Sequence, residues 1–439
     1  MKIIFNFVWP LASVFAKIIV ICTILDLSFT FADDYPGKWY GWHCPHVKQS
    51  DMPGLFRGDA FPDQVVLNSW GYRANDVDEI KGLLPEPFYN MVKHPEIWGA
   101  IRINETAYIS NDEWPGKHIS IRKKATEFYR GGPYIDEKGH IQNYKAGIPF
   151  PESKNGIEIA WNLVTARNFG EKVWCIFTTA VTNKRGHTNF AVVENSYFWF
   201  SGLLYGENGP LYVPNPNRYD SFNAVGYNAP YDLKGSIPLT HRYDDPEKPD
   251  DMWLYIPCLR KVRRLSTTQR WDKLPGGFDF TYDSILCFQG KPTNYEWRYL
   301  GRKILLCGHN SAYRLQQIKG KPGGFPDQQY QRVNTVVLEY RPKIFCPISK
   351  AVLYLDPDSY FPYYAEFYDK NAMLSRFDGN IWSVDTSGLI HPGSMLVTDV
   401  LSVHSTSNYI YDTRNNLDAK NICPSFFAMN YLKGYFGGR

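Results

Sequence analysis

An aromatic, strand-like segment in the middle of the chain leads directly into a basic run. Residues 253–256, which include Trp253 and Tyr255, are aromatic and apolar, as is typical of a strand that is covered on at least one face. Four cations lie within the next eight residues, Arg260, Lys261, Arg263 and Arg264, and Arg270 brings the number to five. Such cations beside an apolar interior can bind a phosphate or carboxylate head group. The alternative is a solvated strand edge whose charges discourage pairing with another chain.

The sequence offers no catalytic motif beside this run. It contains none of the patterns G-x-S-x-G, H-E-x-x-H and G-x-G-x-x-G, and no Walker loop. His43 and His46 flank Cys44, a spacing that could bind a metal, but a second cluster of ligands is missing. Asp356 and Asp358 are expected to form a turn rather than a catalytic carboxylate pair. We therefore expect a protein without enzymatic activity, cofactor or metal, although a catalytic triad need not be local in sequence.

The composition favours a protein of strands and turns. Hydrophobic residues make up 44% of the 439 residues and aromatic residues 16%, together with 30 prolines and 34 glycines. The formal net charge of +4 arises from 48 basic and 44 acidic residues. This balance argues against nucleic acid as a partner, because nucleic-acid-binding proteins usually concentrate basic residues on one face.

The first residues have the features of an export signal. Residues 18–25 are apolar, and Ala32 supplies a small residue where a signal peptidase would cut. We expect residues 1–32 to be a signal peptide, with cleavage after Ala32. A retained membrane helix is the weaker alternative, because Lys17 interrupts the apolar stretch and Asp26 ends it early.

The cysteines predict free thiols rather than a disulfide framework. Removal of the signal peptide with Cys22 leaves seven of the eight cysteines, an odd number, so at least one is unpaired. Most of them lie in apolar, strand-like stretches, where a buried free thiol is the expected state. One or two disulfides remain an alternative, and their connectivity cannot be read from the sequence.

The pattern along the mature chain predicts one domain of antiparallel strands with few helices. Helices are expected at residues 75–93, divided at Gly82 and Pro85, and at residues 155–164, where Asn155 is the candidate N-cap. Strands are expected at residues 99–103, 173–181, 189–200, 278–288, 296–307, 335–345, 351–355 and 365–369. Residues 205–251, rich in Pro, Asn, Tyr and Gly, are expected to be a long insertion that forms a loop.

Three stretches together resemble one protein family. They are residues 146–162, with Phe150 and Trp161, residues 253–264, and residues 283–298. In these stretches the chain resembles the domain-of-unknown-function 1329 family, exported bacterial proteins similar to the lipoprotein carrier LolA. The resemblance covers most of the mature chain. Cys258 and Leu259 depart from it, because the family usually has a Gly-Gln pair there.

The resemblance implies a mainly β fold and a carrier function. The fold would be a strongly curved antiparallel sheet, a half-barrel, with helices packed in its concave face around an apolar cavity. The ligand would be hydrophobic or lipid-like and the location the periplasm of a Gram-negative cell. An outer-membrane protein and a resistance-nodulation-division-type transporter would be the partners. The expected ligand-binding residues are Trp253, Tyr255, Arg260, Arg263, Arg264, Trp161 and Phe150.

Two further classes of function stay open at this point. One is an accessory subunit that docks on an outer-membrane protein, which a solid core with an exposed aromatic patch would favour. The other is a hydrolase of lipids or polymers whose site assembles only in the fold. A Ser or Cys near a His and a carboxylate at a cavity mouth would favour that enzyme.

Overall fold

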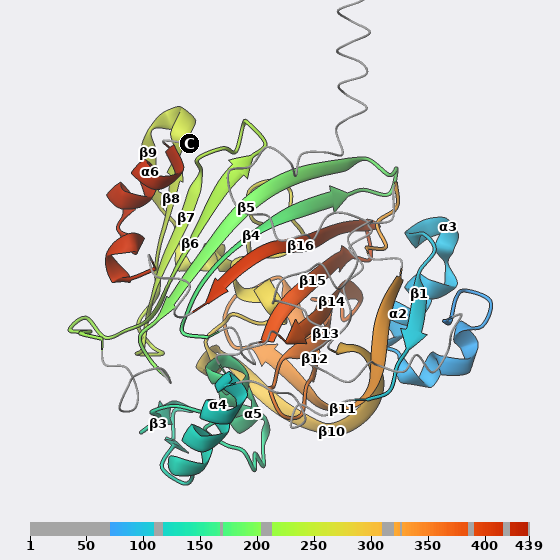
Figure 1. Cartoon of the computed structure of the whole chain (residues 1–439), viewed down its shortest axis with the longest axis horizontal. Coiled ribbons are helices and arrows are strands. Elements are labelled where there is room, and N and C mark those ends of the chain that lie inside the picture. The colour runs from blue at the N-terminus through green and yellow to red at the C-terminus, as the bar shows by residue number, and fades with distance from the viewer. Residues whose placement is uncertain are drawn as a thin grey trace, which may run out of the picture.

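One strongly curved sheet dominates the computed structural model of the chain (Figure 1). The structure describes residues 71–108, 117–166, 170–202, 213–309, 320–324, 327–384, 390–415 and 422–437. The strands are β1 (Arg102–Glu105), β4 (Lys172–Thr182), β5 (Thr188–Trp199), β6 (Tyr219–Ala229), β7 (Ile237–Tyr243), β8 (Asp251–Ile256), β9 (Lys261–Arg264), β10 (Tyr295–His309), β11 (Asp327–Pro342), β12 (Ile348–Leu355), β13 (Pro362–Asp369), β14 (Leu374–Val384), β15 (Ile390–Asp399) and β16 (His404–Asn415). A separate pair consists of β2 (Tyr134–Ile135) and β3 (Ile141–Gln142).

The helices are short and lie around this sheet. The α-helices are α2 (Glu86–Lys93), α3 (Pro95–Trp98), α4 (Lys117–Phe128), α5 (Gly156–Thr165) and α6 (Met429–Gly437). The 3-10 helices are η3 (Val77–Leu83), η5 (Pro257–Leu259), η6 (Thr267–Trp271), η7 (Tyr282–Cys287), η8 (Pro292–Asn294) and η9 (Pro424–Phe427). None of the helices within the described residues is long and apolar enough to cross a membrane.

The order of the strands joins the two ends of the chain in one sheet. The path runs β1-β11-β12-β13-β14-β15-β16-β4-β5-β6-β7-β8-β9, so the late strand β16 pairs with the early strand β4. Strand β10 pairs with β11 along most of its length, and its end pairs with β14 at Gly308 and His309. Strands β10 to β14 therefore close into a ring, and β15, β16 and β4 to β9 continue from it as an open, curved sheet (Figure 1).

The two faces of the open part have different coverings, because successive side chains of a strand point to opposite faces. On the outer face, Phe222, Leu239 and Trp253 pack with α6 and η9 in one apolar cluster. The approach of α6 is close: a Cβ at Gly226 would lie 2.0 Å from a ring carbon of Phe436. The inner face carries the intervening residues of the same strands.

The segment that connects β9 to β10 packs on the inner face. Leu274, Phe278 and Phe280 pack with residues of β4 to β6 and with Val397 of β15 in a second apolar cluster. The segment is pinned by Asp279, whose carboxylate accepts hydrogen bonds from His404 Nδ1 at 2.6 Å and Thr406 Oγ1 at 2.9 Å. Helix α5 lies against β10 at the other end of this inner side.

The mainly β fold with a strongly curved antiparallel sheet is confirmed, and so are the helices expected at residues 75–93 and 155–164. Two local expectations are wrong. Residues 278–288 form no strand but include η7, because this segment lies across the inner face without pairing to a neighbouring strand. Residues 205–251 are not a loop throughout, because they contribute β6 and β7 to the sheet.

Candidate functional site

A cavity of about 510 Å³ opens between the inner face of the sheet and the segment that covers it. Strand β5 contributes Tyr197 and Trp199, and α5 contributes Trp161. The covering segment contributes Phe288 and Lys291 among others. Large aromatic surfaces thus surround a space that also contains charged groups, a composition typical of small-molecule sites.

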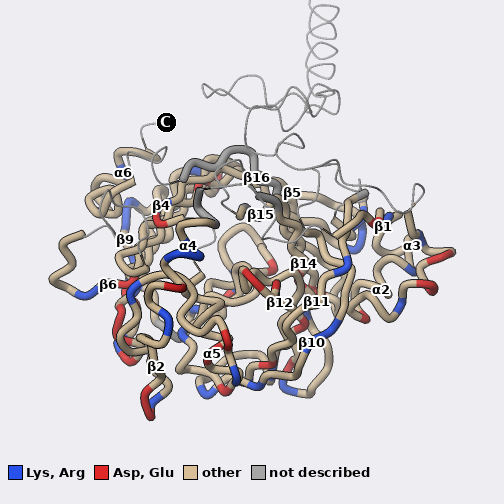
Figure 2. Tube along the Cα trace, turned by 60° about the horizontal axis from the view of Figure 1, so that its bottom comes forward, with Lys and Arg blue, Asp and Glu red and all other residues tan. Residues whose placement is uncertain are grey.

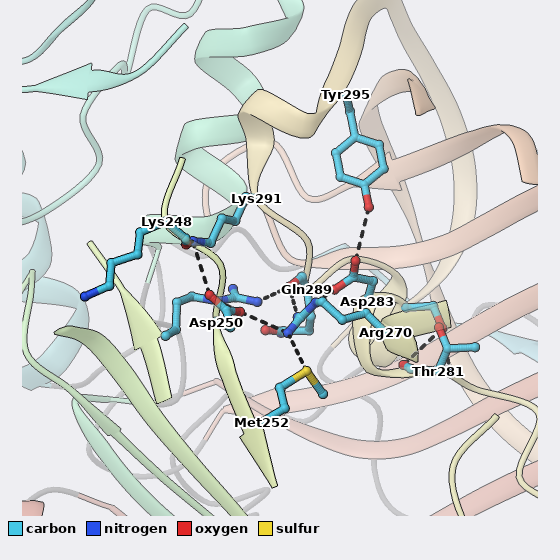
Figure 3. A network of polar contacts seen from close by, with 11 residues as sticks. Lys248, Asp250, Met252, Arg270, Thr281, Asp283, Gln289, Lys291 and Tyr295 are labelled. Atoms are coloured by element: carbon cyan, nitrogen blue, oxygen red, sulfur yellow. Dashed lines mark hydrogen bonds and ion pairs between the residues drawn. The ribbon is translucent and has the colours of Figure 1, made fainter. Parts of the chain in front are cut away.

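One wall of the cavity is a buried network of charged residues (Figure 3). Arg270 lies at its centre and donates from Nε to Asp283 Oδ1 at 2.5 Å and from Nη1 to Asp250 Oδ2 at 2.9 Å. Its Nη2 donates to the carbonyl oxygen of Gln289 at 3.3 Å. Because Asp283 and Gln289 belong to the covering segment and Asp250 immediately precedes β8, Arg270 ties the segment to the sheet.

Asp250 is the carboxylate that three cations share. Arg242 Nε lies 3.1 Å from Oδ2 and Lys291 Nζ lies 3.2 Å from Oδ1, in addition to the contact of Arg270. Burial by itself raises the pKa of Asp250, but the charges of the three cations outweigh it and hold this pKa below its usual value. Asp250 therefore stays ionised although its side chain is only 2% exposed.

A smaller apolar recess of about 90 Å³ lies beside this cavity. Tyr197, Trp199, Ile285 and Leu286 line both spaces, so the recess adjoins the charged wall across these side chains. The inner lining of the recess is almost wholly apolar and includes Val225 of β6. The site thus combines a polar chamber and an apolar pocket.

The covering segment takes its shape from its own sequence as well as from the sheet. Thr281 and Ser284 form a reciprocal capping box at the start of η7. Arg376 of β14 donates to the side-chain and backbone oxygens of Ser284 at 2.6 and 3.2 Å. These bonds fix the position from which Ile285 and Leu286 reach the two spaces.

Of the aromatic residues expected from the sequence near α5, Trp161 lies in the cavity wall and Phe150 does not. The Nε1 of Trp161 donates to the carbonyl oxygen of Gly139 at 2.9 Å, which fixes the indole. The backbone of Phe150 exchanges two hydrogen bonds with the side chain of Asn162, at 2.9 and 2.7 Å. Phe150 thus anchors the turn before α5.

Trp253 and Tyr255 lie on the outer face of β8, away from the cavity. Both pack in the cluster under α6, and Trp253 contacts the ring of His241 edge-on. The side chain of Met252, the residue before Trp253, points to the opposite, inner face and contacts Arg270 there. The parity of β8 therefore separates these two aromatic residues from the charged wall.

The three arginines expected to bind a head group lie at the edge of the sheet. Arg260 is the left-handed residue (φ 49°) that ends η5, and Arg263 and Arg264 lie on β9. All three are exposed, and none lines the cavity. The structure therefore does not bring them together with Trp161.

The cations that do line the cavity were not among the expected ligand-binding residues. Arg242, Arg270 and Lys291 come from β7, η6 and the start of η8. The sequence pointed only to Arg270, as the fifth cation that follows the basic run, whereas Arg242 and Lys291 belong to no such run. The only local signal for the others was Asp250 beside Asp251 at the start of a strand. Because the partners of Asp250 are 8, 20 and 41 residues away, the sequence gives no indication that they meet.

The thiols and histidines of the described residues do not assemble into a reactive site. All six described cysteines are free, and Cys287, Cys307 and Cys346 are buried, as expected. Neither cavity has a histidine in its described lining, and the described residues contain no group of three potential metal ligands. His43, Cys44 and His46, like the expected cleavage position after Ala32, lie outside the described residues.

Comparison with known proteins identifies the family of this chain. The model of the family described as "Protein of unknown function (DUF1329)" matches residues 73–425. An uncharacterized protein of Pseudomonas aeruginosa is 26% identical over 250 residues, which are 54% of this chain and 53% of that protein. The chain therefore matches about half the length of this curated relative.

The solved structures that resemble this chain have low sequence identity and low structural similarity to it. A DUF1329 family protein from Desulfovibrio piger is 16% identical with a TM-score of 0.46, covering 63% of this chain and 96% of that one. A LolA superfamily protein from Nitrosomonas europaea is 13% identical with a TM-score of 0.41, covering 64% of this chain and all of that one.

Proposed function

The chain belongs to the DUF1329 family, and on that premise we propose that it binds and carries an amphiphilic molecule in the periplasm. The observation that carries the proposal is the adjacency of the 510 Å³ chamber and the 90 Å³ apolar recess, which share Tyr197, Trp199, Ile285 and Leu286 in their walls. A molecule with one polar and one apolar end matches such a pair of spaces. A purely polar ligand would leave the recess empty, and a purely apolar one would lie against ionised groups.

The apolar end would enter the recess between Tyr197, Leu286 and Val225. Each methylene that leaves water there contributes about 0.8 kcal/mol to binding. The recess is small, so it would take the end of a chain or a ring, and the wider chamber would hold the remainder. The length of the buried end would therefore set much of the affinity.

The polar end would face the charged wall. Arg242, Arg270 and Lys291 oppose the two carboxylates of Asp250 and Asp283, which leaves one net positive charge (3 − 2) at this wall. A single phosphate or carboxylate would balance that charge through charge-assisted hydrogen bonds. The wall would therefore choose among head groups, while burial of the apolar part in the recess and the chamber contributes much of the binding free energy.

The periplasmic location and the partners of such a carrier remain expectations from the family resemblance. A resistance-nodulation-division-type transporter and an outer-membrane protein would supply and accept the ligand. The absence of a histidine from the described cavity lining gives the hydrolase alternative no support. The accessory-subunit alternative concerns the surface of the molecule rather than the cavity.

Substitution of Val225 by Trp tests the recess. Val225→Trp would fill the apolar pocket and exclude about two methylenes of the ligand, which corresponds to a roughly tenfold weaker Kd. The measurement is fluorescence titration of the purified protein with a dansyl-labelled fatty acid. Ile304→Trp, which introduces the same residue at an exposed position of β10, is the matched control and should leave the Kd unchanged.

Native mass spectrometry with lipid extraction of the wild-type protein completes the test. A co-purifying amphiphile that is lost in Val225→Trp and retained in Ile304→Trp is the expected result. A wild-type protein that carries no lipid and binds no labelled fatty acid would refute the carrier. Release of cleaved products from a bound lipid would instead favour the hydrolase.

A further inference from the structure

We propose that the hairpin of β8 and β9 is a docking surface for a membrane that is rich in anionic phospholipid. Residues 257–264, from the end of β8 to the end of β9, are named the basic hairpin here. The proposal concerns a surface outside the cavity and does not depend on the identity of the carried molecule.

The charge of the basic hairpin is largely uncompensated. Its cations are Arg260, Lys261, Arg263 and Arg264. Only Arg264 has a carboxylate partner among the described residues, Asp251. By contrast, the exposed Arg218 just before β6 forms an ion pair with Asp244 at 3.0 Å. Unpaired, exposed cations at one place instead form an electrostatic site for an anionic partner.

The geometry of the strand presents these charges on both sides of the sheet edge. Lys261 and Arg263 lie opposite Ile256 and Leu254 of β8, while Arg264 lies opposite Trp253, whose side chain is on the outer face. Strand β9 is the end of the strand path, and β8 is its only partner among the described residues. The edge therefore carries cations on either side. Figure 2 shows these Lys and Arg positions as a blue stretch of the trace at β9.

Apolar side chains lie beside these cations. Leu259 at the tip is 48% exposed and Val262 on β9 is 39% exposed. Helix α6 lies next to the hairpin (Figure 1), and its Lys433 Nζ is 5.0 Å from the ring centroid of Tyr255, which pairs with Val262. Cations interleaved with exposed apolar residues are typical of surfaces that bind the head-group region of anionic bilayers.

The features of the hairpin favour a lipid surface over an acidic peptide that would extend the sheet. Strand β9 has only four residues, and its charges are of the kind that discourage edge pairing. A peptide strand would need a longer run of free backbone groups, whereas phosphate head groups need only charge and access. A carrier with such a surface could approach the membrane without inserting a helix.

Vesicle flotation with the full-length mature protein tests the docking surface. Wild type should bind vesicles of phosphatidylcholine and phosphatidylglycerol in equal parts, and should bind vesicles of phosphatidylcholine alone much more weakly. The double variant Lys261→Gln/Arg263→Gln should bind the anionic vesicles about 25-fold more weakly, because each cation near an anionic surface contributes about fivefold. Raising the salt concentration should weaken wild-type binding.

The matched control is Lys184→Gln/Arg185→Gln, which removes one lysine and one arginine from the exposed turn between β4 and β5. This control should bind anionic vesicles like wild type. If both double variants lose the same amount of vesicle binding, the net charge of the protein explains the loss and the proposal is overturned. The charge-conserving pair Lys261→Arg/Arg263→Lys should restore binding and thereby separate loss of charge from loss of fold. The proposal would also be overturned if the wild-type protein bound an acidic peptide but did not bind anionic vesicles.

Discussion

Asp250 is the residue on which the charged wall depends. One carboxylate, buried at 2% exposure, holds Arg242, Arg270 and Lys291 within 3.2 Å. Loss of its charge would leave three largely buried cations, 12–18% exposed, with Asp283 as the remaining carboxylate. Burying cations without enough counter-charge destabilises the folded protein far more than the loss of a surface ion pair does.

We therefore expect Asp250→Asn to lower the free energy of unfolding by about 3–5 kcal/mol. The neighbouring change Asp251→Asn should cost at most about 1 kcal/mol, because the ion-pair partner Arg264 is 73% exposed. The amide oxygen of the new Asn can still accept the hydrogen bond that Tyr243 donates to Asp251. Urea denaturation followed by circular dichroism measures both variants under the same conditions. Equal losses in the two variants would mean that the network adds nothing beyond an ordinary ion pair.

The stability difference between wild type and Asp250→Asn should also depend on pH. The folded-state pKa of Asp250 lies below its unfolded value, so its contribution is present above the unfolded pKa of about 3.9 and is lost as the pH falls through the folded pKa. The stability gap between wild type and Asp250→Asn should therefore be widest near neutral pH and narrow in acid. A gap that stays constant down to pH values below about 3.9 would contradict this account.

At the scale of elements, α5 positions the aromatic wall of the cavity. Asn155 accepts a hydrogen bond from the backbone nitrogen of Glu158 at 3.1 Å and so caps the helix. The helix begins close to β10, because a Cβ at Gly156 would lie 2.6 Å from the carbonyl carbon of Trp297. The cap and this contact together hold Trp161 over the cavity.

Asn155→Ala should destabilise the protein by about 1 kcal/mol through loss of the cap. Asn155→Asp, which keeps an acceptor at the same position, should retain most of the stability. Thermal unfolding compares the two variants directly. If Asn155→Asp loses as much stability as Asn155→Ala, the side chain of Asn155 stabilises the protein through something other than capping.

At the scale of the whole molecule, the sheet is continuous from the closed ring to the open edge. Strands β15 and β16 link the ring to β4 through antiparallel backbone pairing, with one register shift between β14 and β15 and one between β16 and β4. The covering segment adds contacts across this junction, since Asp279 bonds to β16 and Ser284 to Arg376 of β14. The single mature domain expected from the sequence remains a prediction, and these links are its physical basis.

We expect unfolding in one cooperative transition. Tryptophan fluorescence, to which all 13 tryptophans contribute, among them Trp382 in the ring and Trp253 on β8, should follow the same urea curve as far-ultraviolet circular dichroism. Two separated midpoints for the two probes would show that the ring and the open sheet fold as independent units.

The sequence by itself determined the class of fold and many of its local elements. Alternating and aromatic stretches identified β4, β5, β8 and β10 to β13, because the side-chain period of a strand is local. Asn155 identified the start of α5, because a cap acts within three residues. Asp356 identified a turn, and its Oδ1 indeed accepts from the backbone nitrogens of Asp358 and Ser359.

Only the tertiary structure decided what these elements enclose. Pairing assigned Trp253 and Tyr255 to the outer face and left Arg263 at a free edge, and neither outcome follows from residue type. The charged wall unites cations from separate elements around Asp250, and the recess requires a covering segment that the sequence presented as a strand. Residue type and local period set which elements form, whereas the neighbours of a side chain depend on strand order and register, which are set by contacts distant in sequence.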